Sequence, residues 1–235
     1  MLRRLASLVR KSPDAKNNYV HNSYSQCGED LIIDFIFQQL AIDKPSYIDI
    51  GAHHPRFINN TYLFYKKGAR GISIEPDPSL IAEFNSLRKE DINLNIGIGD
   101  KNGEADFYIM NEPTLNTFVR EEAERTSDEK GGYHIKEVKK IMISPLADVI
   151  NKYCNGKFPD LLSIDVEGLD EQILKSIDYN SAVPKVMCVE TLTFSSKGKG
   201  VKKTELIEFV KSKGYMIYAD TYINTIFVKE DIYMK

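Results

Sequence analysis

Acidic residues stand at or just beyond the ends of five short apolar segments of this chain. These acids are Asp49, Glu75, Asp100, the pair Asp165 and Glu167, and Glu190. Acids are depleted in β-strands and are rarely buried without partners, so their recurrence in equivalent places is poorly explained by turn formation alone. Because open α/β sheets bind ligands outside the carboxyl ends of their strands, the pattern predicts a binding site.

The acids that follow the first three segments suit an adenosine-type cofactor. Gly51 would let a ligand approach the backbone closely, and Asp49 would accept a hydrogen bond from an ammonium group or a loop amide. Glu75 would accept both hydroxyl protons of a ribose, since a carboxylate has two oxygens. Asp100 follows the third segment and is expected to reach the adenine amino group.

The glycine pattern after the first segment indicates which cofactor this is. His53 stands where a second glycine of the G-x-G-x-x-G motif would be. The pyrophosphate of a dinucleotide needs that glycine-lined helix start, whereas S-adenosylmethionine has no phosphate. The glycine pattern therefore counts against a dinucleotide and is compatible with S-adenosylmethionine.

Methyl transfer to a hydroxyl needs an aligned nucleophile and a base that takes its proton. His54 is one candidate, because histidine titrates near neutral pH; the alternative for His54 is a turn residue that bonds the backbone before Pro55. Asp165 and Glu167 are further candidates, as bases or as acceptors for sugar hydroxyls. The alternative for Glu167 is an acid that favours the N-terminus of the next helix.

A divalent metal is less favoured than a metal-free site. Asp165 and Glu190 would supply oxygen ligands of the kind that magnesium prefers, and the ion would lower the pKa of the acceptor hydroxyl. No spacing of histidine and cysteine indicates zinc.

Apolar periodicity predicts the elements that position these residues. Strands are expected at residues 46–50, 71–75, 92–98, 161–166 and 186–190, and the main helices at 29–40, 78–89, 145–153, 169–177 and 204–213. Residues 215–219 and 223–228 form a final hairpin, because so short a link cannot cross over to a parallel strand. A mostly parallel seven-stranded sheet with a C-terminal antiparallel hairpin and helices on both faces is the Rossmann-like arrangement of S-adenosylmethionine-dependent methyltransferases.

The length of 235 residues suits one α/β domain. We expect a basic segment and linker at residues 1–23 and a single catalytic domain at 24–235. An insertion at about residues 111–135 is either a lid or a solvated face, and its composition favours the solvated face. Gln26 precedes the first strand and is expected to fold over the cofactor or acceptor cleft.

Composition excludes several classes of partner. The net charge of -3 shows no footprint for nucleic acid, and no apolar run is long enough to be a membrane span. The basic N-terminus could make weak contact with a membrane surface, although a loosely docked terminal helix is favoured. Three cysteines without a close pair fit the reducing cytoplasm. Nothing in the sequence indicates an oligomeric state.

Five segments together resemble the FkbM family of methyltransferases. They are SQCGED (25–30), IDIGAHHP (48–55), NNTYL (59–63), GISIEP (71–76) and LSIDVEGLD (162–170). The resemblance covers roughly residues 23–230 and implies an S-adenosylmethionine-dependent enzyme that methylates a hydroxyl of a sugar, glycan or related small molecule.

The resemblance also implies roles for individual positions. Those on the cofactor side are Asp49, Gly51, Asn60, Glu75, Pro76 and Asp100, and residues 165–168 would face both methyl donor and acceptor. His53 departs from the family pattern, because many members have asparagine there. Alternatives are a catalytically silent binding module of the same fold, a methyltransferase acting on nitrogen, and a nicotinamide-dependent oxidoreductase, against which the missing glycine and the final hairpin argue.

Overall fold

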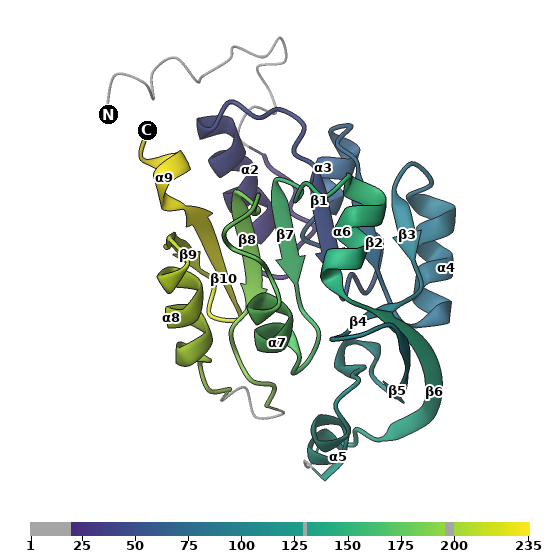
Figure 1. Cartoon of the computed structure of the whole chain (residues 1–235). Helices are drawn as coiled ribbons and strands as arrows, with labels where there is room; N and C mark the ends of the chain where they lie inside the picture. Colours follow the sequence, from purple (N-terminus) through teal and green to yellow (C-terminus); the bar gives the residue numbers. More distant parts are fainter. Residues whose placement is uncertain (1–19, 129–130, 196–199) are drawn as a thin grey trace.

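Seven strands form the central sheet, in the order β3-β2-β1-β7-β8-β10-β9 (Figure 1). The computed structural model describes residues 20–128, 131–195 and 200–235, so most of the predicted basic N-terminal segment lies outside the described residues. The strands are β1 (Tyr47–Ile50), β2 (Gly71–Ile74), β3 (Ile92–Leu94), β7 (Leu161–Ile164), β8 (Val186–Glu190), β9 (Tyr215–Asp220) and β10 (Asn224–Lys229). Strand β10 is antiparallel to both β8 and β9, and the other neighbours are parallel. This order confirms the expected sheet and its terminal hairpin.

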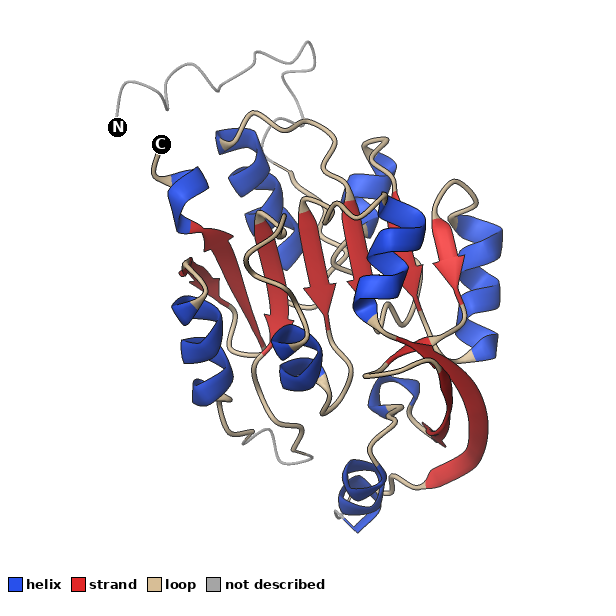
Figure 2. Ribbon diagram, in the orientation of Figure 1, coloured by secondary structure: helices blue, strands red, loops and turns tan. Residues whose placement is uncertain are grey.

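Helices cover both faces of the sheet (Figure 2). One face packs against α6 (Leu146–Cys154), α7 (Asp170–Lys175) and α8 (Thr204–Ser212), and the other against α2 (Glu29–Gln39) and α3 (Tyr62–Lys66). The described residues also form the helices α4 (Pro78–Leu87), α5 (Arg120–Asp128) and α9 (Glu230–Tyr233), with a 3-10 turn η1 at Pro113–Leu115. Among the described residues, no helix has the length and apolar character needed to cross a membrane.

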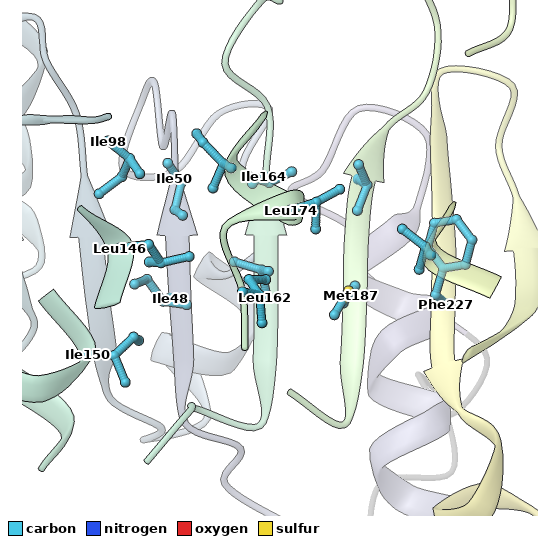
Figure 3. Packing of buried hydrophobic residues seen from close by; sticks show 14 of the residues in the cluster. Ile48, Ile50, Ile98, Leu146, Ile150, Leu162, Ile164, Leu174, Met187 and Phe227 are labelled. Atoms are coloured by element: carbon cyan, nitrogen blue, oxygen red, sulfur yellow. The ribbon is translucent and has the colours of Figure 1, made fainter. Parts of the chain in front are cut away.

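Strand alternation decides which side chains reach each face. Ile48 and Ile50 pack with Leu162 and Ile164 in the core under α6 and α7 (Figure 3). Successive side chains of a strand point to opposite faces, so Asp49 lies on the face that α2 and α3 cover. Because the core side chains are apolar and fully buried, they hold the strand ends, and the acids there, in fixed positions.

The strand expected at residues 92–98 is confirmed for Ile92–Leu94 (β3), but its second half is wrong, because the chain leaves the main sheet after Leu94. The side-chain amide of Asn95 donates to the backbone carbonyls of Glu75 (2.9 Å) and Pro76 (2.7 Å). Residues Gly97–Ile98 then form β4 in a second sheet of order β4-β6-β5, with β5 at Gly103–Met110 and β6 at Ile135–Ser144. Figure 1 shows this second sheet beyond the carboxyl ends of β1 and β2.

Candidate active site

A cavity of about 570 Å³ lies at the carboxyl ends of β1, β2, β7 and β8. Six carboxyl residues line it: Asp49, Glu75, Glu112, Asp165, Glu167 and Glu190. Of the residues the structure describes, no lysine or arginine is part of the lining. The cavity also brings together four further residues that the sequence predicted: Gln26, Gly51, Asn60 and Pro76. Its wall is therefore rich in carboxyl groups.

Asp100 is not part of this cavity, which corrects the expected contact with adenine. Because β4 belongs to the second sheet, Asp100 falls in the turn between β4 and β5 and is exposed. The same edge of the cavity is instead lined by Gly97, Ile98 and Phe118. A Cβ on Gly97 would lie 2.4 Å from the Phe118 ring, so only glycine allows this close packing.

His54 also lies outside the cavity lining, so the structure does not support its expected role as base. Its Nδ1 accepts the backbone N–H groups of Arg56 (3.1 Å) and Phe57 (2.9 Å). Its Nε2 lies 3.2 Å from a carboxylate oxygen of Glu83. Both ring nitrogens are thus engaged, and His54 has the backbone-bonding role of a turn residue.

His53, in contrast, lines the cavity. It has a positive φ of 53°, and its N–H donates to Glu75 Oε2 at 2.8 Å. Burial lowers the pKa of the imidazole, and its Nδ1 is buried without a hydrogen-bond partner. A buried ring nitrogen without a partner is costly in an apoprotein, so His53 offers a polar contact to a bound molecule. The sequence marked this position as the missing second glycine and as a departure from the family pattern, but not as a contact for a ligand.

Glu75 is held firmly at the end of β2. Its Oε2 accepts from His53 N–H and its Oε1 accepts from Asp77 N–H, each at 2.8 Å. Burial raises the pKa of Glu75 to about 8. Each oxygen retains a lone pair, so the carboxylate can still accept two hydroxyl protons.

Asp49 is connected to a buried arginine that the sequence did not indicate. Its Oδ2 accepts from Thr61 Oγ1 (2.8 Å) and Asn59 Nδ2 (3.2 Å). Arg88 donates to Asn59 Oδ1 (3.1 Å) and to Thr61 Oγ1 (3.0 Å). Burial raises the pKa of Asp49, and the positive charge of Arg88 opposes that rise.

Arg88 is itself fully buried next to Asp91. Its Nε donates to Asp91 Oδ2 at 2.8 Å, and its Nη2 donates to the Tyr47 hydroxyl at 2.8 Å. That hydroxyl donates in turn to Asp91. A charged residue near the end of a helix is usually solvent-exposed, which is why the sequence pattern did not single out Arg88.

Three carboxylates converge after β7 and β8. Oxygens of Asp165, Glu167 and Glu190 all lie within 4.8 Å of one another. Burial and the neighbouring Glu190 raise the pKa values of Asp165 and Glu167. Burial raises the pKa of Glu190 to about 7, although Lys203 opposes that rise with an Nζ 2.9 Å away. Carboxyl groups with raised pKa values can accept a proton near neutral pH.

Strained backbone is concentrated in the cavity wall. Four lining residues other than glycine have positive φ: His53, Ile58, Glu167 and Tyr222. Such conformations cost about 1–3 kcal/mol each and persist where the surroundings enforce them. At Glu167 the Thr117 hydroxyl donates to the backbone carbonyl at 2.8 Å. The strain therefore orients acid-bearing loops toward the cavity.

The predicted insertion forms part of the cavity wall. Tyr108 and Thr117 exchange backbone hydrogen bonds, which draws residues 112–118 against β5 and over the cavity. The solvated face that composition favoured describes residues 112–114 and α5, where Arg120 and Glu124 are exposed. Leu115 and Thr117, in contrast, are buried. Phe194 packs in the same cluster as Leu115 and contacts the Tyr133 ring at 5.6 Å between centroids.

The strand order, with a ligand-sized cavity at the strand ends, is the Rossmann-like arrangement of S-adenosylmethionine-dependent methyltransferases, and a family match shows that the chain is of this class. The model of the methyltransferase FkbM domain matches residues 49–217. This chain belongs to the FkbM methyltransferase family.

Solved structures of methyltransferases are similar to the chain at low identity. An FkbM methyltransferase from Methylobacillus flagellatus is 14% identical, with a TM-score of 0.42 over 79% of this chain and 44% of that one. A TehB-like SAM-dependent methyltransferase from Corynebacterium glutamicum is 15% identical, with a TM-score of 0.45 over 97% of this chain and 94% of that one. No curated protein matches the chain.

Proposed function

We propose that this protein transfers the methyl group of S-adenosylmethionine to a hydroxyl of a sugar, glycan or related small molecule. The observation that carries the proposal is the carboxyl-rich lining of the cavity, whose described residues include six carboxyl residues and no lysine or arginine. S-adenosylmethionine carries a sulfonium and an ammonium group against a single carboxylate, so its net positive charge favours the ionised form of these buried carboxyls and is attracted by it. The pyrophosphate of a nicotinamide dinucleotide would be repelled by the same wall.

The residues present fit this cofactor. A cavity of about 570 Å³ is within the usual range for small-molecule sites. Glu75 retains acceptor capacity for a ribose, and the unpartnered Nδ1 of His53 offers a further polar contact. We assign Gln26, Asp49, Gly51, Asn60 and Pro76, with Glu75, to the cofactor side. When bound, S-adenosylmethionine supplies a methyl group activated for displacement.

The carboxylate cluster is proposed to serve the acceptor. Asp165 or Glu167 takes the proton of the acceptor hydroxyl, because their pKa values are raised by burial and by Glu190. Lys203 holds Glu190 and Asp170 in place through its Nζ. The other group of the cluster orients the acceptor by accepting a second hydroxyl proton. An intact cluster of this kind argues against a catalytically silent module.

A metal-assisted variant is the second candidate. The oxygens of Asp165, Glu167 and Glu190 are close enough together to bind one ion, and oxygen ligands suit magnesium. Lys203 already neutralises part of the charge on Glu190, so we propose the metal-free mechanism. Turnover should then survive chelation by EDTA, and loss of turnover with recovery on adding magnesium would favour the metal.

We also propose that the protein works in the cytoplasm. Cys27, Cys154 and Cys188 are all free thiols. Free thiols without disulfides are typical of a reducing compartment.

Calorimetric titration with S-adenosylhomocysteine tests the cofactor assignment. Wild-type protein should bind it, and Glu75→Gln should bind at least about tenfold more weakly, because an amide at this position loses one charged acceptor. Glu208→Gln is the matched control, since Glu208 is exposed on α8 and pairs with Lys211. Equal affinity in Glu75→Gln and Glu208→Gln would contradict the assignment of Glu75.

A further inference from the structure

A second hollow of about 400 Å³ adjoins the main cavity. Residues 23–26 and 56–58 line it, and it shares Gln26 and Ile58 with the main cavity. The two hollows therefore lie on either side of the same two residues. A molecule long enough to occupy both would pass Gln26 and Ile58.

Tyr24 and Arg56 line the second hollow, and Lys66 and Tyr62 contact them from outside its lining. We call these four residues the cationic rim: Tyr24, Arg56, Tyr62 and Lys66. The guanidinium of Arg56 lies 5.8 Å from the centre of the Tyr62 ring. Lys66 Nζ lies 5.0 Å from the centre of the Tyr24 ring and donates to its hydroxyl at 2.6 Å. The Tyr24 and Tyr62 rings pack edge to face with their centroids 4.8 Å apart. Both cations therefore contact the same pair of aromatic rings.

The charges of Arg56 and Lys66 have no carboxylate partner in the described part of the chain. Within residues 20–128, 131–195 and 200–235, no carboxylate forms an ion pair with Arg56 or Lys66. Nearby cations do have such partners, since Lys67 pairs with Asp34 and Arg70 with Glu90. Two like charges held near each other without an acid favour the binding of an anion.

Asp30 is an acid in the first turn of α2, next to residues 23–26, and its oxygens are already engaged. They accept from Ser23 Oγ (2.6 Å), Tyr24 N–H (2.7 Å) and Ser25 Oγ (2.9 Å). Because Asp30 is also buried, it is not placed to neutralise the exposed side chain of Arg56.

The segment that carries Arg56 is held in one conformation. His54 Nδ1 accepts the N–H groups of Arg56 and Phe57, and Ile58 has a φ of 50°. The Phe57 side chain next to Arg56 is 64% exposed, an apolar surface beside the charge. The second half of the His53-His54-Pro55 motif thus shapes the rim and does not reach the main cavity.

We propose that the methyl acceptor carries an anionic group, a phosphoryl or a carboxylate, that binds Arg56 and Lys66. The hydroxyl-bearing part then extends past Gln26 and Ile58 into the acidic cavity. The carboxyl groups of that cavity would repel the anion. The anionic end of the acceptor therefore stays at the cationic rim, and the hydroxyl end enters the main cavity. The inference rests on the proposed methyl transfer to a hydroxyl and names the class of its substrate.

Ligand-observed NMR with the full chain, saturated with S-adenosylhomocysteine, tests this substrate class. The probes are glucose 1-phosphate, glucuronate and glucose. We expect binding of one or both anionic probes, and about tenfold weaker binding of glucose. Arg56→Gln should weaken the anionic probe by about tenfold, whereas Lys67→Gln, which removes a cation already paired with Asp34, should not.

The outcomes separate this inference from the proposed function. Preference for glucose 1-phosphate identifies a phosphoryl group and preference for glucuronate identifies a carboxylate, and either supports the inference. Binding of glucose as tight as that of the anions, absence of binding by both anions, or unchanged binding in Arg56→Gln overturns it. The affinity for S-adenosylhomocysteine should be the same in wild type and Arg56→Gln, and failure of wild type to bind it would count against the proposed function instead.

Discussion

Gly51 and Asp165 lie so close that a Cβ on Gly51 would be 1.8 Å from the backbone carbonyl oxygen of Asp165. Gly51 also has a φ of 75°, which disfavours other residues. The sequence predicted glycine here for the approach of a ligand. The structure adds that Gly51 lets the loop after β1 pack directly against the loop after β7. The loop after β7 carries Asp165 and Glu167, which are assigned to the acceptor.

Gly51→Ala should therefore destabilise the protein by about 2–4 kcal/mol, since strain and a backbone clash act together. It should also weaken binding of S-adenosylhomocysteine. Gly103→Ala is the control, because a Cβ there meets nothing within 4 Å. Urea unfolding measures the difference, and equal free energies of unfolding for the two variants would contradict this role of Gly51.

Arg88→Met should destabilise the protein by about 3–5 kcal/mol, because removal of one partner leaves Asp91 as an uncompensated buried charge. Arg70→Met removes a partly exposed pair with Glu90 and should cost no more than about 1 kcal/mol. Denaturant unfolding compares the two. A cost for Arg88→Met as small as that for Arg70→Met would show that the buried network contributes little.

The pH dependence of stability should report the buried carboxyl of Glu75. Its folded pKa of about 8 lies above its ordinary value of 4.5, so its contribution to stability is fully present below pH 4.5 and is lost as the pH rises toward 8. The unfolding free energy of ligand-free wild type should therefore fall relative to Glu75→Gln across this interval. Thermal or urea unfolding at several pH values measures it, and a constant difference would mean that Glu75 titrates normally.

Much of the site followed from the sequence because its acids stand where buried strands end. Apolar runs marked β1, β2, β7 and β8, and sheet topology then brought Asp49, Glu75, Asp165 and Glu190 to one edge. What the sequence did not indicate depends on tertiary contacts. Phe118 packs on Gly97, which lies in β4 of the second sheet. Because β4 leaves the main sheet, the turn after it carries Asp100 away from the cavity.

Local patterns likewise gave no sign of two other features. The burial of Arg88 depends on Asp91, Asn59 and Thr61, which come together only in the fold. His54 was a reasonable base by residue type, but its ring bonds the backbone of the two residues after Pro55.

Asp165→Asn and Glu167→Gln should keep their affinity for S-adenosylhomocysteine while at least one of them loses about 10²-fold or more in turnover, as expected for a missing general base. Turnover is measured as release of S-adenosylhomocysteine with an acceptor that the wild type methylates. Glu208→Gln, exposed on α8, controls for loss of a charge. Full turnover in both cluster variants would show that the base lies elsewhere.

The carboxyl-rich cavity should select a sulfonium cofactor over a dinucleotide. Parallel calorimetric titrations of the wild type with S-adenosylmethionine and with NAD compare the two compounds. The lining, with six carboxyl residues and no described lysine or arginine, predicts one-to-one binding of S-adenosylmethionine and no measurable binding of NAD. Binding of NAD, or folded protein that binds neither compound, would contradict this selectivity.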